Sequence, residues 1–309
     1  MELFRLKRDI PFMRWARTTI FFSLAAILGA VVLLATRGLN LGVDFTGGTL
    51  MEVGYPTAAD LPAIRAHLAR NGHADAQVQT FGRATDVLIR LPVKPGVTSA
   101  QLSEQVLQVL RAHTPQVELR RVEFVGPQVG RELFEDGALA LLVVSIGIVI
   151  YLALRFEWRF AVGAIFATAH DIFVLLGVWS AFQWEFSLTV LAALLAILGY
   201  SVNDTVVVFD RIRENFRKSR ITDIAALMDN AKTATLSRTV ITSGTTLLVV
   251  LALLFFGGEV LWGFAMALAI GIVVGTYSSV LVASPIVLWL GVSREDFIKP
   301  PKPEGGAVV

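Results

Sequence analysis

The sequence predicts a polytopic α-helical membrane protein, with six transmembrane helices and a βαββαβ ferredoxin-like extracytoplasmic domain between helices 1 and 2. Three observations support this fold class. Of the 309 residues, 55% are hydrophobic and 17% are charged, which is more apolar than a soluble globular domain needs. Six apolar runs are long enough to cross a bilayer. The segment between the first two runs is polar, with patterns typical of alternating strands and helices.

The first apolar run extends from Thr18 to Ala35 and follows a basic N-terminal segment, whose cations are Arg5, Lys7, Arg8, Arg14 and Arg17. A signal peptide has a shorter apolar core and a small-residue cleavage site. Residues 1–36 are therefore interpreted as a cytoplasmic segment followed by an uncleaved first transmembrane helix.

Residues 37–133 are predicted to form the extracytoplasmic domain, because the first helix leaves the membrane there. Alternating apolar residues predict strands at residues 50–55, 77–81, 86–91 and 117–125. Helical spacing predicts helices at residues 59–71 and 98–113, the second of them capped by Thr98. The resulting order, β-α-β-β-α-β, is typical of a ferredoxin-like sandwich.

Residues 134–291 contain the other five apolar runs, at about 137–154, 160–182, 187–209, 240–257 and 262–290. The turn 155–159, the loop 211–238 and the tail 292–309 carry Lys and Arg, whereas the opposite turns carry neither. The positive-inside rule therefore places both termini and the loop 211–238 in the cytoplasm. Within that loop, the spacing of apolar residues over 222–232 predicts an amphipathic helix along the membrane surface.

The fourth span carries polar residues just before its charged cytoplasmic end. Ser201, Asp204 and Thr205 share one helical face with Val208, and Asn203 lies beside Asp204. A carboxyl group at this depth costs at least about 2.5 kcal/mol on insertion scales, so Asp204 is a candidate functional residue. The alternative is a purely structural hydrogen-bonded clasp between helices.

Two further polar sites lie near membrane depth. His170 and Asp171 interrupt the third span, either as a proton relay or as a structural pair that grips a neighbouring helix. Arg238 opens the fifth span, and Thr242 follows it on the same face. Arg238 could act on a nearby aspartate, or it could be an interfacial arginine that snorkels to lipid headgroups.

Several classes of function have no support in the sequence. There are no cysteines, only four histidines, and no nucleophile elbow, phosphate loop or metal-ligand pattern. The net charge of +2 reflects membrane orientation rather than nucleic-acid binding. We therefore expect a protein that is not an enzyme and that uses no cofactor or metal.

Five motifs occur in one order along nearly the whole chain: LGVDFTGGT at 41–49, VGPQVGREL at 125–133, AHD at 169–171, GYSVNDTVVVFDRIREN at 199–215 and LSRTVITSGTTL at 236–247. In these motifs, the chain resembles the SecF branch of the SecD/SecF family, which is related to the resistance–nodulation–division transporters. The motif residues show no departure from the family pattern.

The resemblance implies a subunit that pairs with SecD, docks on the SecYEG translocon in the bacterial cytoplasmic membrane and uses the proton-motive force in late preprotein export. YajC is a further candidate partner, beside the translocating preprotein and membrane lipids. The resemblance also implies that Asp204 carries protons and that Arg238 is its charged partner. It marks a set of motif or hinge positions around the outer domain, namely Asp44, Phe45, Gly47, Gly48, Gly126 and Pro127.

Two rival functions remain open at this point. One is a proton-coupled exporter of small molecules or lipids from the same superfamily, which would need a substrate cleft in the outer domain. The other is a non-transporting scaffold of the translocon, which would need no titrating carboxyl group.

Overall fold

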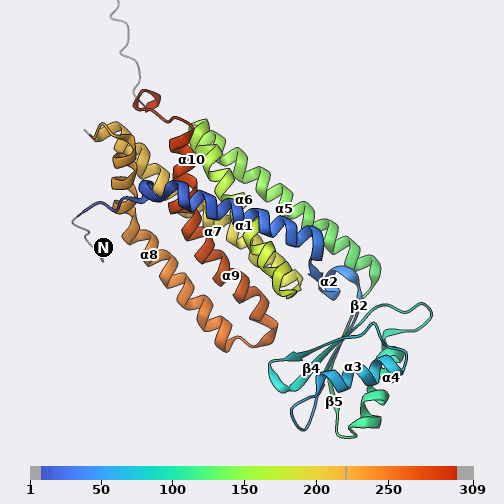
Figure 1. Ribbon diagram of the computed structural model, residues 1–309. Helices are drawn as coiled ribbons and strands as arrows, with labels where there is room; N and C mark the ends of the chain where they lie inside the picture. Colours follow the sequence, from blue (N-terminus) through green and yellow to red (C-terminus); the bar gives the residue numbers. More distant parts are fainter. Residues whose placement is uncertain (1–7, 220, 298–309) are drawn as a thin grey trace, which may run out of the picture.

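The computed structural model describes residues 8–219 and 221–297 and shows a bundle of long helices with a smaller α/β domain at one end (Figure 1). Five of the basic residues expected on the cytoplasmic side lie outside the described residues, namely Arg5, Lys7, Arg220, Lys299 and Lys302.

The described part of the chain contains six helices that are long and apolar enough to cross a membrane, which confirms the predicted number of spans. The chain is therefore a multi-pass membrane protein. After the 3₁₀ turn η1 (Phe12–Trp15), the spans are α1 (Ala16–Arg37), α5 (Pro127–Arg155), α6 (Trp158–Phe182), α7 (Leu188–Lys218), α8 (Ile224–Phe256) and a sixth made of α9 (Glu259–Ser278), the π-helical turn η2 (Ser279–Ala283) and α10 (Ser284–Trp289). A 3₁₀ turn, η3 (Arg294–Phe297), ends the described chain.

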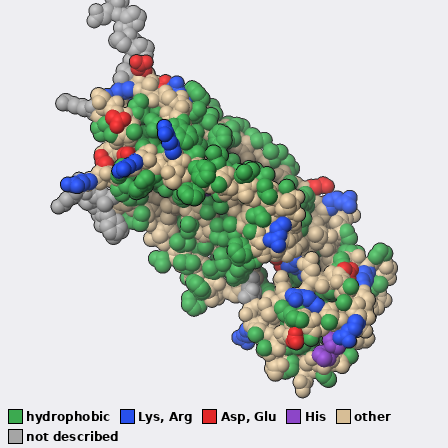
Figure 2. Space-filling view, viewed as in Figure 1, with side chains coloured by type: hydrophobic (Ala, Val, Ile, Leu, Met, Phe, Trp, Pro, Cys, Tyr) green, Lys and Arg blue, Asp and Glu red, His purple; other side chains and the backbone are tan. Residues whose placement is uncertain are grey.

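Three of the spans form the interior of the bundle. In the apolar windows of α6, α7 and the sixth span, 50%, 56% and 56% of residues are buried, against 11%, 11% and 17% in α1, α5 and α8. The outer helices present a broad apolar surface between two charged ends (Figure 2). Polar side chains at membrane depth are consequently best shielded where α6, α7 and α9 meet.

The smaller domain follows the predicted β-α-β-β-α-β order. Its elements are β2 (Gly48–Gly54), α3 (Leu61–Arg70), β3 (Gln77–Phe81), β4 (Arg83–Leu91), α4 (Ser99–His113) and β5 (Glu118–Val125). The strands form one antiparallel sheet in the order β3-β4-β2-β5. Met51, Val53 and Ile89 are fully buried on the sheet and pack in one cluster with Leu68 of α3 and Val106 of α4.

Local sequence signals explain where the two helices of this domain begin. The Asp60 side chain accepts a hydrogen bond from the Ala63 backbone at 3.1 Å, and Thr98 forms a reciprocal capping box with Gln101. Such caps satisfy backbone N–H groups that have no partner within the helix. The predicted start of α4 at Thr98 is confirmed.

The structure differs from the sequence prediction in the loop 211–238. An amphipathic helix along the membrane surface was expected over residues 222–232, but α8 continues from Ile224 to Phe256 without a break. Its apolar residues Leu227, Met228 and Ala231 pack into the same cluster as Phe216 of α7. The prediction of a surface-lying helix was therefore wrong, because this apolar face is buried against protein.

Two short elements connect the smaller domain with the bundle. β1 (Asn40–Leu41) pairs in parallel with β6 (Glu185–Phe186), which lies between α6 and α7. The short helix α2 (Val43–Thr46) follows β1 and leads through two glycines into β2. The sequence did not predict the pairing of β1 with β6, because it joins segments far apart in the chain.

The α/β domain has its own core, so we expect residues 47–126 to fold when expressed without the bundle. The fragment should be a soluble monomer whose circular dichroism spectrum contains both helix and strand, with one cooperative thermal transition. Size-exclusion chromatography and circular dichroism check this. An aggregated fragment, or an entirely helical spectrum, would show that the domain depends on the bundle.

Candidate functional site

The polar face predicted on α7 points into the bundle. Ser201, Asp204, Thr205 and Val208 have exposed fractions of 2%, 4%, 2% and 1%. Their burial confirms that this face avoids lipid, as their spacing at i, i+3, i+4 and i+7 requires. Asn203, by contrast, is exposed on the opposite side of α7 and does not join the buried residues.

Asp204 is held weakly by its surroundings. Its Oδ2 accepts a hydrogen bond from Ser243 Oγ of α8 at 3.4 Å, near the limit of hydrogen-bond length. Ser243 in turn accepts from the Tyr200 hydroxyl at 3.1 Å and lies 2.8 Å from Thr276 Oγ1 of α9. The carboxyl group thus lies where α7, α8 and α9 meet, with most of its acceptor capacity unused among the described residues.

Arg238 does not form an ion pair with Asp204 among the described residues, since the guanidinium is more than 4.0 Å from the carboxylate. Its side chain is exposed on α8. Thr242 donates to the backbone of its own helix, at Arg238 O and Thr239 O, and does not reach Asp204. The predicted partners of Asp204 are therefore not joined to it in this conformation.

Ser243, which the sequence reasoning missed, supplies the contact to Asp204. A signal was available, because Thr235, Thr239 and Ser243 recur at every fourth residue of α8 and therefore share one face. All three are buried, with exposed fractions of 9%, 1% and 8%.

The second buried carboxyl group, Asp171, is held much more firmly. Its Oδ2 accepts hydrogen bonds from Ser201 of α7 at 2.5 Å and Ser278 of α9 at 2.8 Å, and its Oδ1 lies 3.0 Å from His170 Nδ1. Asp171 is 2% exposed and joins the three inner helices. Gly275 makes room for this contact, because a Cβ there would lie 3.2 Å from Ser201 Cβ. The Ser201 hydroxyl therefore donates its hydrogen bond to Asp171 and not to Asp204.

A π-helical turn follows this cluster in the sixth span. Pro285 lacks the N–H group that would bond the Leu281 carbonyl one turn earlier. Thr19 Oγ1 of α1 donates to that carbonyl at 3.0 Å, and the Tyr277 hydroxyl donates to Thr19 O at 3.0 Å. These two hydrogen bonds connect α1 to the π-helical part of the sixth span. Single π turns within helices occur often at functional sites.

The predicted motif or hinge positions come together at one junction between the α/β domain and the bundle. Phe45 of α2 is buried and stacks 6.0 Å from the Phe186 ring, while Asp44 Oδ2 accepts from the Leu188 backbone N–H at 2.8 Å. Gly126 caps α5, and Pro127 is its first residue. Asp44 thereby connects the segment before β2 to the first turn of α7.

Gly47 and Gly48 are required at this junction for two reasons. Their φ angles are +69° and +141°, a region that favours glycine. A Cβ on Gly47 would lie 2.8 Å from Pro127 Cα, and one on Gly48 would lie 2.6 Å from Leu91 O. Gly47 thus lets the motif at 41–49 pack directly against the start of α5, and Gly48 lets it pack against the end of β4.

A buried ion pair connects the sheet of the α/β domain to the loop between α6 and α7. Arg90 of β4 pairs with Glu185 of β6, and their side chains are 7% and 25% exposed. Burial raises the pKa of the Glu185 carboxyl, and the neighbouring Arg90 offsets part of that shift. The sequence offered one clue, because Arg90 is a lone cation within the apolar strand Val87–Leu91.

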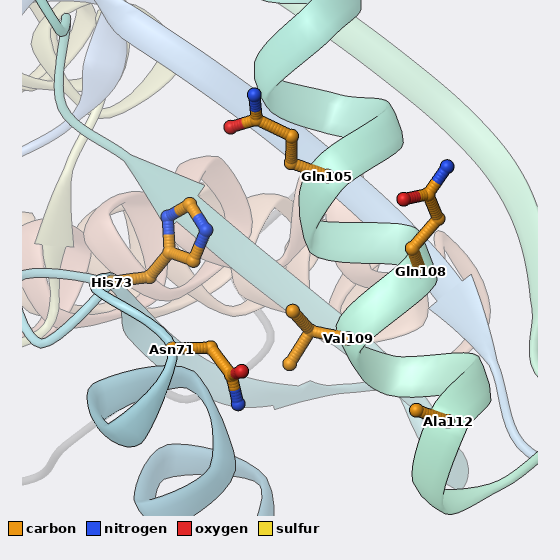
Figure 3. Close-up of a pocket in the computed structure, with 6 residues that line it drawn as sticks. All are labelled: Asn71, His73, Gln105, Gln108, Val109 and Ala112. Carbon is orange, nitrogen blue, oxygen red and sulfur yellow. The ribbon is translucent and has the colours of Figure 1, made fainter.

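The α/β domain also contains an open hollow of about 390 Å³ between α4 and the segment that follows α3. Gln105, Gln108, Val109 and Ala112 line it from α4, while Asn71 and His73 face them from the other side (Figure 3). Three of these six lining residues carry amide side chains. Among the described residues, no group of three or more His, Asp or Glu side chains could hold a metal ion.

Family comparisons agree with the motifs. The sequence profile of the family described as "Protein export membrane protein SecD/SecF, C-terminal" matches residues 105–293. The profile described as "SecD/SecF GG Motif" matches residues 32–56, which contain Gly47 and Gly48.

Relatives of known name cover the whole chain. Protein translocase subunit SecF of Vibrio alginolyticus is 50% identical over 307 residues, which are 99% of this chain and 98% of that protein. The subunit of the same name from Escherichia coli O157:H7 is 43% identical over 303 residues, covering 97% of this chain and 94% of its own length.

Solved structures show the same fold within a longer chain. The crystal structure of SecDF, a translocon-associated membrane protein from Thermus thermophilus, matches 94% of this chain with a TM-score of 0.84 and 37% identity. A SecDF structure in the super-membrane-facing form matches 93% with a TM-score of 0.69 and 38% identity. This chain spans 40% of each solved chain. It therefore belongs to the SecD/SecF family of protein-export membrane proteins, as a translocase subunit of the SecF type.

Proposed function

We propose that the chain uses the proton-motive force, together with a SecD partner, to drive late-stage preprotein export through a bacterial Sec translocase. The observation that supports this most is the contrast between two buried carboxyl groups. Asp171 is held by partners on three helices, whereas Asp204 has one hydrogen bond of 3.4 Å. A carboxyl group with few partners loses few interactions when it takes up a proton.

In this mechanism Asp204 carries the proton and Arg238 responds to its charge. Ionised Asp204 attracts Arg238, and protonation removes that attraction. Because α8 is a peripheral helix, its approach and withdrawal would not require the three inner helices to separate. The conformation described above, with Asp204 and Arg238 apart, corresponds to the state in which this attraction is not engaged.

Asp171 and His170 have a different role in the proposal. Asp171 anchors α6, α7 and α9 through hydrogen bonds to Ser201 and Ser278, and His170 completes its shell. These contacts favour the interpretation of His170 and Asp171 as a structural pair over their interpretation as a proton relay. The anchored inner helices would provide the fixed frame against which α8 moves.

The α/β domain is proposed to be a ferredoxin-like domain on the extracytoplasmic side, with both termini in the cytoplasm. Its strand order and the distribution of Lys and Arg support this assignment. α7 offers a direct mechanical link, because Leu188 in its first turn bonds Asp44 and Asp204 lies sixteen residues later, about 24 Å along the helix. A shift of α7 along its axis would therefore displace Asp44 and the junction with the α/β domain.

A SecD partner would complete the bundle. This chain spans 40% of the solved SecDF chains, and its Asn203 and Arg238 are exposed on neighbouring helices α7 and α8. Polar side chains at membrane depth are stable when they face protein or water rather than lipid. Docking on SecYEG, contact with YajC and binding of the preprotein belong to the same proposal and rest on the family membership.

Two alternatives remain in competition with this proposal. A small-molecule or lipid exporter would need an apolar cleft in the outer domain, whereas four of the six residues that line the hollow there are polar. A scaffold would need no titrating carboxyl group. Asp204, however, is buried at a cost in free energy and is held by only one long hydrogen bond. Both observations favour the proton-driven subunit.

The proposal is tested by translocation into inverted membrane vesicles that contain SecYEG, SecD and this chain. We expect completion of export after the ATP-driven step to slow several-fold when a protonophore collapses the gradient. Vesicles without this chain should show the slow rate with or without the gradient. If the gradient accelerates export equally in both kinds of vesicle, the chain is a scaffold.

A further inference from the structure

A hollow of about 350 Å³ lies at the end of the bundle that bears both described termini, between the ends of α5 and α7. Every lining side chain is charged. Arg155 ends α5, and the rest occupy one face of α7 at i, i+3, i+4, i+7 and i+8, namely Asp210, Arg213, Glu214, Arg217 and Lys218. The proton pathway proposed above uses none of these residues.

The charges in this hollow do not cancel, because four cations face two carboxylates. Arg155 binds both oxygens of Asp210, at 2.6 and 2.7 Å, and Lys218 pairs with Glu214 at 3.0 Å. Arg213 donates from Nη1 to the Arg155 carbonyl at 3.3 Å, and its Nε forms only a long ion pair with Glu157 at 3.9 Å, which leaves Nη2 without a hydrogen-bond partner among the described residues. Arg217 is exposed and forms no ion pair within the described part of the chain. Arg213 and Arg217 therefore have donors available for an anion.

The hollow also lies at the depth of lipid headgroups. Arg155 is the last residue of a membrane-spanning helix, and Tyr151 precedes it by one turn on the same face, 47% exposed. Leu154 beside it is 84% exposed. Tyrosine at a helix end is typical of the membrane interface, and large exposed apolar side chains below it suit acyl chains. A cationic hollow directly above such a surface suits a ligand with an anionic head and an apolar tail.

We propose that this hollow binds the phosphate of an anionic phospholipid, with Arg213 and Arg217 as its ligands and with the acyl chains against Tyr151 and Leu154. Guanidinium groups pair well with phosphate oxygens, because their donors form a planar fork. The bound lipid would join the end of α5 to the extension of α7 and so brace this end of the bundle.

Free phosphate offers the same anionic chemistry without a tail, so the test separates the two sources. Native mass spectrometry of the full-length protein in detergent would count bound lipids during titration with phosphatidylglycerol, with phosphatidylcholine as the neutral lipid. A second titration would include an excess of inorganic phosphate. We expect phosphatidylglycerol to bind more tightly than phosphatidylcholine and inorganic phosphate not to displace it.

The variant Arg213→Gln/Arg217→Gln should bind phosphatidylglycerol at least about tenfold more weakly, since each interfacial cation contributes about 1 kcal/mol. The matched control is Arg14→Gln/Arg17→Gln, which removes two exposed cations from the start of α1 outside the hollow. It should bind as the wild type does. The single variant Arg217→Gln, at an exposed position, should show an intermediate loss without any effect on folding.

Three results would overturn the proposal. Equal losses in the two double variants would mean that only general surface charge attracts the lipid. Equal binding of phosphatidylglycerol and phosphatidylcholine would show that the cations do not select the headgroup. Displacement by inorganic phosphate would assign the hollow to a free anion instead of a lipid. None of these outcomes bears on the role of Asp204, so this proposal and the proposed function fail independently.

Discussion

Replacing Asp204 by asparagine is expected to abolish the acceleration of export by the proton gradient and to leave the slower, ATP-driven step intact. The amide keeps the size of the side chain and can still accept from Ser243 Oγ, which now lies 3.4 Å from Oδ2. It cannot take up or release a proton, so Arg238 would experience one constant environment. Translocation into inverted vesicles, with and without a protonophore, measures the loss.

The matched control is Asp171→Asn, the other buried carboxyl group of the bundle. It removes the charge from three close contacts, and each hydrogen bond to a charged group is worth about 1.5–3 kcal/mol. We therefore expect Asp171→Asn to lower the apparent melting temperature of the purified protein. Asp204→Asn should not lower it, because a neutral amide costs less to bury than a carboxylate.

This pair of variants separates a proton carrier from a structural anchor. Gradient-dependent export at the wild-type rate in the Asp204→Asn protein would rule out the proposed carrier. If both variants lowered the melting temperature equally, Asp204 would be a clasp between helices, as the structural interpretation of the α7 face requires.

The second large effect is expected at Gly130, in the first turns of α5. A Cβ there would lie 2.8 Å from Gly47 N and 3.0 Å from Phe45 O, so it would meet backbone atoms that cannot rotate away. Gly130→Ala should displace α2 from α5 and destabilise the protein by about 1–3 kcal/mol, as overpacking typically does. Export should fall as well, because this junction connects the outer domain to the bundle.

Gly147 supplies the control within the same helix. A Cβ at Gly147 meets no atom within 4 Å, and the residue is exposed. Gly147→Ala should leave export unchanged and should be neutral or stabilising by up to about 1 kcal/mol, since alanine favours the helix. Thermal unfolding of both variants in detergent checks the contrast. Equal melting temperatures would show that the α2–α5 contact is loose and that Gly130 is dispensable.

Much of the architecture could be predicted from the sequence because it depends on periodicity along one segment. Six apolar runs were enough to predict six spans, and Thr98 with Gln101 predicted the start of α4. The i, i+3, i+4 spacing of Ser201, Asp204 and Thr205 predicted a shared face, and burial energetics required that face to avoid lipid. These inferences need no knowledge of any neighbouring helix.

The partners across helices could not be predicted in this way. The spacing of residues placed Ser201 and Asp204 on one face of α7. The packing of the helices, however, makes Ser201 a hydrogen-bond donor to Asp171 of α6, which also accepts from α9. The hydrogen bond to Asp204 comes instead from Ser243 of α8. The periodicity of a helix identifies which residues share a face. It does not identify which helix covers that face, at what height, or at what rotation.

The same limit explains the prediction that failed. The apolar spacing of Leu227, Met228 and Ala231 was read correctly as one helical face, but membrane lipid and the side chains of α7 are equally apolar neighbours for such a face. The pairing of Arg90 with Glu185 also joins residues 95 positions apart, through the approach of β4 to β6. The sequence by itself determined which side chains must be buried. Only the tertiary structure decided what they are buried against, because such contacts depend on the packing of whole elements and leave no local pattern.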